Sequence, residues 1–67
     1  MVTTAIRTHR SVDTLGAHEY TGVLPSTLAY WRKRGEGPRW YKIGRRVMYD
    51  IADLDAFIDR SKAKASA

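Results

Sequence analysis

Apolar and polar positions in the middle of the chain repeat with the period of an amphipathic helix. Leu24, Leu28 and Trp31 follow one another at intervals of four and three residues, which brings their side chains to one helix face. Pro25 suits the first helical position, and Gly35 suits the residue after the helix end, where the backbone turns left-handed. The pattern therefore predicts a helix between these two residues. The polar outer face of this helix carries Ser26, Thr27, Tyr30 and Lys33.

The preceding segment, residues 12–23, permits a first helix and a tight connection to the second. Its apolar positions are Val12, Leu15, Tyr20 and Val23. Ser11 or Asp13 is the expected N-cap, and Gly16 within the helix should cost up to about 1 kcal/mol relative to alanine. Gly22 supplies the positive φ that a short turn between helices requires. Together these features predict a helix-turn-helix.

Two runs of aromatic and branched residues after the second helix predict a β-hairpin. The runs are residues 40–43 and 47–49, and they flank Gly44-Arg45-Arg46, which places both arginines at the tip. Because side chains alternate between the faces of a strand, pairing Ile43 with Val47 would gather the apolar side chains on one face. The expected core residues are Tyr41, Ile43, Val47 and Tyr49, with Tyr41 opposite Tyr49 and with Lys42 and Met48 on the other face.

A third helix is predicted after the hairpin, with Asp50 as its cap and Asp53 in the capping-box position. The apolar residues that recur on one of its faces are Ile51, Leu54, Phe57 and Ile58. Residues 1–10 and 61–67 are polar and show no such pattern, so we expect a flexible arm and a flexible tail around a domain spanning 11–60. The sequence predicts an α+β fold of the winged helix-turn-helix type.

The chain is short and basic, which narrows its function class. Its 67 residues allow one small domain, and 12 Lys and Arg against 7 Asp and Glu give a net charge of +5. Seven basic residues lie between Arg32 and Arg46, whereas residues 50–59 hold four Asp and no cation. This distribution predicts a positive side that meets a phosphate-rich partner and a negative side that does not.

Enzyme, metal and membrane functions find little support in the residues. The chain has no cysteine for disulfides or zinc, and it has no apolar run long enough for secretion or for a membrane span, so we expect a cytoplasmic protein. His9 and His18 lack the partners of a catalytic or metal site. The Asp residues of the third helix suit either its positive N-terminal end or its solvent-exposed face, so they do not indicate a metal site. We expect a binding module without catalytic residues, metal or cofactor.

The second helix and the hairpin tip are the candidate contacts to double-stranded DNA. Residues 25–34 contain no acid, although solvent-exposed helices commonly mix acids and bases, and an outward Tyr30 is unusual without a partner. Ser26, Thr27, Tyr30 and Lys33 are expected in the major groove. The hairpin tip is a solvated turn or a DNA-gripping wing, in which case Arg45 and Arg46 hold the minor groove or the backbone. The expected phosphate contacts are Arg32, Arg34, Arg39 and Lys42.

Three sequence blocks, in this order, resemble the excisionase-like branch of the MerR-type winged helices over about residues 12 to 58. The blocks are Thr21-Gly22-Val23-Leu24-Pro25-Ser26-Thr27-Leu28-Ala29-Tyr30-Trp31 with Gly37-Pro38, Tyr41-Lys42-Ile43-Gly44-Arg45-Arg46-Val47, and Asp53-Leu54-Asp55-Ala56-Phe57-Ile58. In that family the helix after the Gly-Val pair enters the major groove, the strand-Gly-Arg-Arg-strand element is the wing, and the last helix packs behind them. The family usually has Ser or Thr where Leu24 stands, so a side-chain cap worth about 1 kcal/mol is missing unless Ser26 or Thr27 replaces it.

The resemblance implies a phage or mobile-element excisionase, also called a recombination directionality factor. Such a protein binds attachment-site DNA and steers an integrase towards excision in the bacterial cell. Because one small module reads too few base pairs to find a single site in a genome, we also expect several copies on neighbouring half-sites. Asp55, Asp59 and residues 61–67 would remain free to meet protein. Two alternatives stay open, a small transcriptional regulator of the same fold and an interaction module whose basic face meets an acidic protein.

Overall fold

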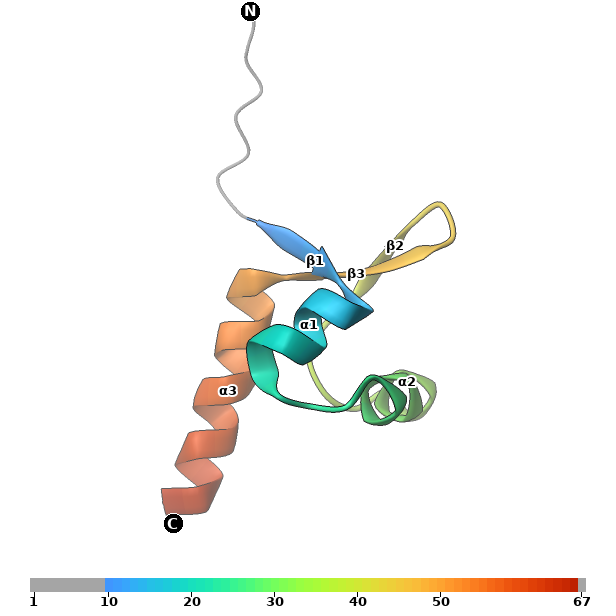
Figure 1. Ribbon diagram of the computed structural model, residues 1–67. Helices are drawn as coiled ribbons and strands as arrows, with labels where there is room; N and C mark the ends of the chain where they lie inside the picture. Colours follow the sequence, from blue (N-terminus) through green and yellow to red (C-terminus); the bar gives the residue numbers. More distant parts are fainter. Residues whose placement is uncertain (1–9, 67) are drawn as a thin grey trace, which may run out of the picture.

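The computed structural model describes residues 10–66, which form three helices and a three-stranded antiparallel sheet with strand order β1-β3-β2 (Figure 1). The elements are β1 (Ser11–Asp13), α1 (Thr14–Thr21), α2 (Pro25–Arg34), β2 (Tyr41–Ile43), β3 (Arg46–Asp50) and α3 (Ile51–Ser66). The helix-turn-helix of α1 and α2 and the wing formed by the β2-β3 hairpin together make an α+β winged helix-turn-helix fold, as predicted. The flexible arm expected at 1–10 lies, apart from Arg10, outside the described residues.

The turn and the second helix have the predicted bounds. Gly22, with φ of 81°, follows α1, and its N–H donates to the His18 carbonyl oxygen at 2.7 Å. Helix α2 begins at Pro25 and ends before Gly35, which has φ of 71°. Leu24 occupies the N-cap position and makes no side-chain capping bond, as its missing hydroxyl implies. Local signals alone therefore defined the bounds of this helix.

Strand β1 was not predicted, because three residues are too few to show the alternation of a strand. Residues expected to open the first helix instead pair with β3, with Val12 opposite Tyr49. Asp13 ends this strand and caps α1, since its Oδ1 accepts the Gly16 N–H at 2.9 Å. A Cβ added at Gly16 would lie 2.6 Å from the Val12 Cβ, so the glycine is what lets α1 approach the strand.

The predicted hairpin register is wrong by one residue. Ile43 pairs with Arg46 and Lys42 pairs with Val47, because Gly44, at φ of 61°, starts a two-residue turn instead of a three-residue one. A shift of one residue moves side chains to the opposite face of a strand. Tyr41 and Ile43 therefore leave the core face for the outer face of the sheet, and Lys42 joins the core-side face.

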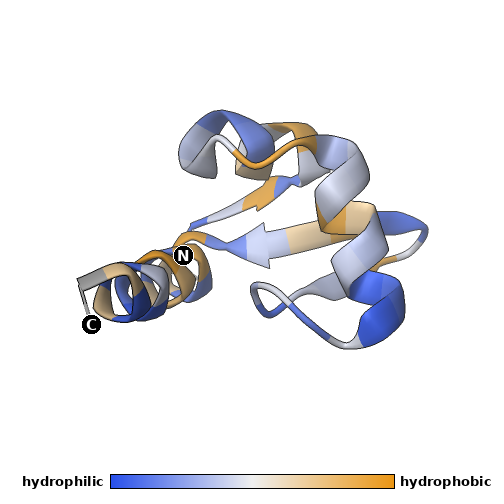
Figure 2. Cartoon of the chain, turned by 90° about the horizontal axis from the view of Figure 1, so that it is seen from below, coloured by the Kyte–Doolittle hydropathy of each residue, from blue (hydrophilic) through white to orange (hydrophobic). Residues whose placement is uncertain are grey.

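The core draws one fully buried side chain from each helix and one from the central strand. These residues are Ala17, Leu28, Tyr49 and Leu54. The partly buried residues around them are Val12, Val23, Trp31, Val47 and Ile51. Leu15 and Leu24, expected to face the core, are 58% and 60% exposed, because the short α1 and the turn after it turn them outward. Figure 2 shows the strongly hydrophilic last turn of α2 on the far side of the molecule from α3.

Helix α3 is longer than predicted, since it continues to Ser66 through most of the segment expected to be a flexible tail. Leu54 on its inner face is fully buried, and Phe57 packs on Trp31 of α2 with ring centroids 5.4 Å apart. The alternating Lys and Ala residues after Ser61 extend the helix beyond the core, because both are good helix formers that need no apolar face of their own. The C-terminal half of α3 thus projects from the domain, as Figure 1 shows.

Candidate nucleic-acid interface

The outer face of α2 exposes polar and aromatic side chains and carries no acid. Ser26 and Lys33 are exposed and Thr27 is half-buried, while Tyr30 is 57% exposed. The basic last turn suits the negative end of the helix dipole. The structure brings these four predicted residues together on one exposed helix face.

Arg34, an expected phosphate contact, lies against its own helix and the following loop. Its guanidinium carbon is 5.4 Å from the centre of the Tyr30 ring, and its Nε donates to Glu36 Oε1 at 3.4 Å. The ion pair with Glu36 is about half exposed on both sides, so it contributes little to stability. The Arg34 guanidinium therefore lies beside the Tyr30 ring on the outer face of α2.

Arg32, a further expected phosphate contact, connects the elements of the domain. Its Nη1 donates to the Tyr49 hydroxyl at 2.7 Å and to Thr14 Oγ1 at 3.5 Å, and its guanidinium carbon is 5.9 Å from the centre of the Trp40 ring. Tyr49 is fully buried, so this bond ties α2 to the central strand. Sequence reasoning missed this role, since Arg32 and its partner are 17 positions apart.

The two arginines expected at the hairpin tip lie in different places. Arg45 belongs to the exposed two-residue turn, whereas Arg46 is the first residue of β3. Arg46 Nη1 is 3.8 Å from Asp13 Oδ2, on the outer face of the sheet. The register shift explains the difference, because it takes Arg46 out of the loop and into the strand.

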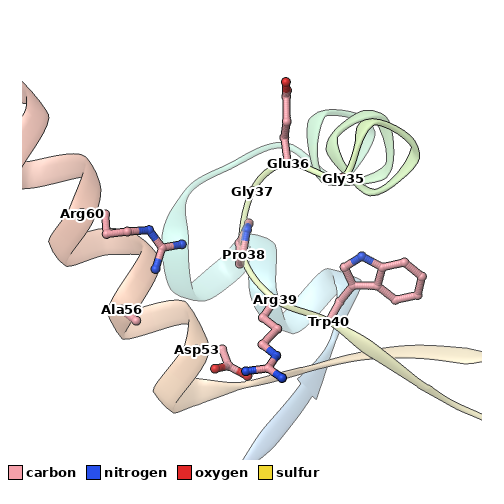
Figure 3. A pocket seen from close by; sticks show the side chains of 9 residues that line it. All are labelled: Gly35, Glu36, Gly37, Pro38, Arg39, Trp40, Asp53, Ala56 and Arg60. Carbon is pink, nitrogen blue, oxygen red and sulfur yellow. The ribbon is translucent and has the colours of Figure 1, made fainter.

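Arg39 and Trp40 point in opposite directions (Figure 3). Arg39 points towards Asp53 of α3, in a cavity of about 430 Å³ that the loop after α2 forms with α3. Trp40 points away from α3, and the residue is 37% exposed. Arg39, expected to bind phosphate, therefore lies on the α3 side, while Trp40, which sequence reasoning did not assign to the interface, lies on the α2 side. The signal for Trp40 in the sequence was its place at the start of the first run of the predicted basic hairpin.

Helix α2 and the hairpin lie on one side of the domain, and α3 lies on the other (Figure 1). On the α3 side, Asp55 and Asp59 are exposed as predicted. Asp55 also accepts a hydrogen bond from the Tyr20 hydroxyl at 2.5 Å. This bond, together with the negative charge of Asp55, raises the pKa of Tyr20 above its ordinary value of 10.0.

Other chemistry is sparse in the part of the chain that the structure describes. Within residues 10–66, no group of three or more His, Cys, Asp or Glu side chains could hold a metal ion. None of the described helices is long and apolar enough to cross a membrane. His18, for which the sequence offered no catalytic or metal-binding partner, is half-buried, and its Nδ1–H donates to the Val23 carbonyl oxygen at 2.9 Å. Its role in the described region is to close the turn between the helices.

A helix with an exposed polar face beside a basic hairpin defines a small winged helix-turn-helix DNA-binding domain. A family model described as a helix-turn-helix domain matches residues 17–62, which is most of the 67-residue chain, and the protein belongs to this family. The match covers α2, the hairpin and most of α3. No curated protein and no solved structure matches the chain.

Proposed function

We propose that the protein is an excisionase, a recombination directionality factor that binds attachment-site DNA and steers an integrase towards excision. The observation that carries the proposal is the acid-free exposed face of α2 on the same side of the domain as the Arg45 turn. The three sequence blocks that resemble the excisionase-like winged helices support the finer assignment. The protein would act in the bacterial cytoplasm, on the nucleoid.

The proposed DNA contacts follow from exposure and position. Helix α2 enters the major groove with Ser26, Thr27, Tyr30 and Lys33, and the hairpin places Arg45 against the adjacent minor groove or backbone. Arg34 and Arg46 add positive charge near the duplex, whereas Arg39 points towards Asp53 on the α3 side and is left out of the proposed contacts. Arg32 serves mainly to hold α2 in place, because its guanidinium is bonded inside the domain.

Several copies of the protein would bind neighbouring half-sites. A module of this size buries about 600–1,000 Å² on DNA and gains about 1–3 kcal/mol for each well-read base pair, which is too little to find one site in a genome. Copies whose wings grip successive grooves would also bend the duplex. Titration of a footprinted natural site should give a Hill slope above one and more than one shifted band. A slope of one with a single band would contradict cooperative binding.

The α3 side would meet the integrase or a neighbouring copy, because DNA occupies the opposite side. Reversing the charge of Asp55 and Asp59, as Asp55→Lys with Asp59→Lys, should leave affinity for an isolated site nearly unchanged and reduce excision. Deleting residues 61–67 should act in the same direction. The matched control is Tyr20→Phe, which removes the hydrogen bond to Asp55 and keeps the surface charge. Wild-type excision by the charge-reversed, truncated protein would rule this partner surface out.

Footprinting and reconstituted recombination decide the function. Protection of attachment sites, with excision in the presence of the cognate integrase that depends on this protein, is the expected result. Protection confined to a promoter would favour the alternative, a small transcriptional regulator of the same fold. Equal affinity for every duplex at physiological salt, with tight binding to an acidic protein, would favour an interaction module instead.

A further inference from the structure

A hollow of about 300 Å³ opens between α2 and the hairpin. It is lined by Ala29, Arg32, Lys33, Trp40, Lys42 and Val47. Three of these residues are cationic, and among the residues that the structure describes none that lines the hollow is acidic. A concave surface with this charge concentrates anionic groups.

The two lysines reach the hollow from opposite walls. Lys33 comes from the last turn of α2, and Lys42 comes from β2. The register of the hairpin decides the place of Lys42, since pairing with Val47 puts it on the same face of the sheet as Tyr49. Both lysines are exposed, so each ammonium group is free to turn towards a ligand between the walls.

Arg32 and Trp40 form the fixed part of the hollow. The bond from Arg32 Nη1 to the buried Tyr49 hydroxyl sets the position of the guanidinium, and the Trp40 ring lies 5.9 Å from it. The hydrogen bonds from Arg32 to Tyr49 and Thr14 both leave from Nη1, and a guanidinium has five N–H donors in all. The indole of Trp40 adds a flat apolar ring and one further N–H donor at the exposed edge.

The hollow lies where a DNA strand would pass. Adjacent major and minor grooves of a duplex are separated by one sugar-phosphate backbone, so the space between a helix in one groove and a wing in the other faces that backbone. Lysine ammonium groups are compact point charges that suit phosphate oxygens. We propose that the hollow binds one backbone phosphate, held jointly by Lys33 and Lys42, with the Trp40 ring against the adjoining deoxyribose. The inference rests on the proposed DNA-binding mode and adds a shared phosphate site and a tryptophan contact to it.

The test measures the salt dependence of binding for Lys33→Ala, Lys42→Ala and the double variant. If both lysines neutralise the same phosphate, each single variant keeps nearly the wild-type slope of log K against log salt, and the double variant loses about 0.9. A loss of about 1.8 in the double variant would mean separate phosphates, and no loss would mean no phosphate at all. Either result would overturn the shared site. Lys64→Ala removes the same charge from exposed α3 and should leave the slope unchanged.

Tryptophan fluorescence tests the second part of the proposal. Wild-type protein should change its emission on binding a duplex, and Trp40→Phe should lose most of this change because Trp31 is packed on Phe57 away from the hollow. Circular dichroism of Trp40→Phe confirms that the variant folds. An unchanged emission response in Trp40→Phe would remove Trp40 from the site.

Both measurements use an attachment-site duplex and a scrambled duplex of equal length. Phosphate contacts carry no sequence information, so the slope and the emission should respond alike on both. Equal affinity for the two duplexes would refute the excisionase proposal and leave the phosphate site standing. A preference for the attachment site, without the salt dependence expected when two lysines share one phosphate, would refute the phosphate site and leave the excisionase proposal standing.

Discussion

Helices α2 and α3 pack on the same core but present opposite chemistry to solvent. Each contributes one fully buried leucine, Leu28 from α2 and Leu54 from α3. Helix α2 has no acid and ends in three cations, whereas α3 begins with an acidic half. The apolar pattern is therefore alike in both helices, and the pattern of charge separates the proposed DNA-binding side from the supporting side.

The largest effect should come from the supporting helix. Leu54→Ala empties a fully buried position, which typically costs about 2–5 kcal/mol and consumes much of the stability of a small domain. Urea unfolding measures the loss. Asp59→Ala, on the exposed face of the same helix, should change stability by less than about 0.5 kcal/mol. Comparable losses in the two variants would contradict the assignment of Leu54 to the core.

A substitution on the exposed face of α2 should have a smaller effect, and this effect should be on base preference and not on stability. Tyr30→Ala should change base preference by about 1–3 kcal/mol at one position of the site, because the exposed Tyr30 side chain would meet base edges in the proposed complex. Thermal stability should stay near that of the wild type. Selection of bound sequences from a random pool compares the two proteins. An unaltered consensus would show that Tyr30 does not read bases.

The two wing arginines should differ from each other. Arg45→Ala should weaken binding to all sequences alike and lower the salt slope by about 0.9, since its side chain stands on the exposed turn. Arg46→Ala should lower the slope less and should cost up to about 1 kcal/mol of stability through loss of the Asp13 pair. Salt titrations and urea unfolding of both variants provide the comparison. Identical salt slopes for Arg45→Ala and Arg46→Ala would contradict this difference and would indicate that both arginines act from the hairpin tip.

The smallest effect concerns pH and the α3 side. Because the hydrogen bond to Asp55 raises the pKa of Tyr20, its contribution to stability is complete below the ordinary tyrosine pKa of 10.0 and is lost as pH rises through the higher folded value. Ultraviolet titration of the wild type and Tyr20→Phe should reveal one tyrosine that ionises late. DNA affinity at neutral pH should be the same for both proteins. The absence of a late-ionising group would contradict the bond.

The sequence predicted those elements whose signals are local. Pro25 and Gly35 defined the ends of α2, and Gly22 defined the turn, because their backbone preferences act within a few residues. The hairpin was found but its register was not, since Gly44 permits a loop of either two or three residues, and the two loop lengths put the side chains of β2 on opposite faces of the sheet. The fold class could be predicted, whereas the face of the sheet on which each strand side chain lies could not.

Long-range pairs account for the contacts at the candidate site that the sequence did not reveal. The exposed residues of α2 followed from helical spacing, and the structure places them as expected. Arg32 and Arg46 were assigned to DNA by their charge, yet each has a partner in a distant element, Tyr49 and Asp13 respectively. Strand β1 was missed for the same reason, since its only evidence is its pairing with β3.

The pairing of β3 on both edges has a consequence for the entropy of binding. Residues Arg46 to Met48 pair with β2, and Met48 to Asp50 pair with β1, so the two ladders overlap at Met48. The second ladder, between β1 and β3, therefore anchors the base of the hairpin and holds the hairpin in a fixed position where it extends from the sheet. Ordering a mobile loop on DNA would cost about 0.5–1.5 kcal/mol for each immobilised side chain, and an arm that is already ordered avoids much of that loss. In the proposed complex, a preorganised wing of this kind could also transmit force to the bound duplex.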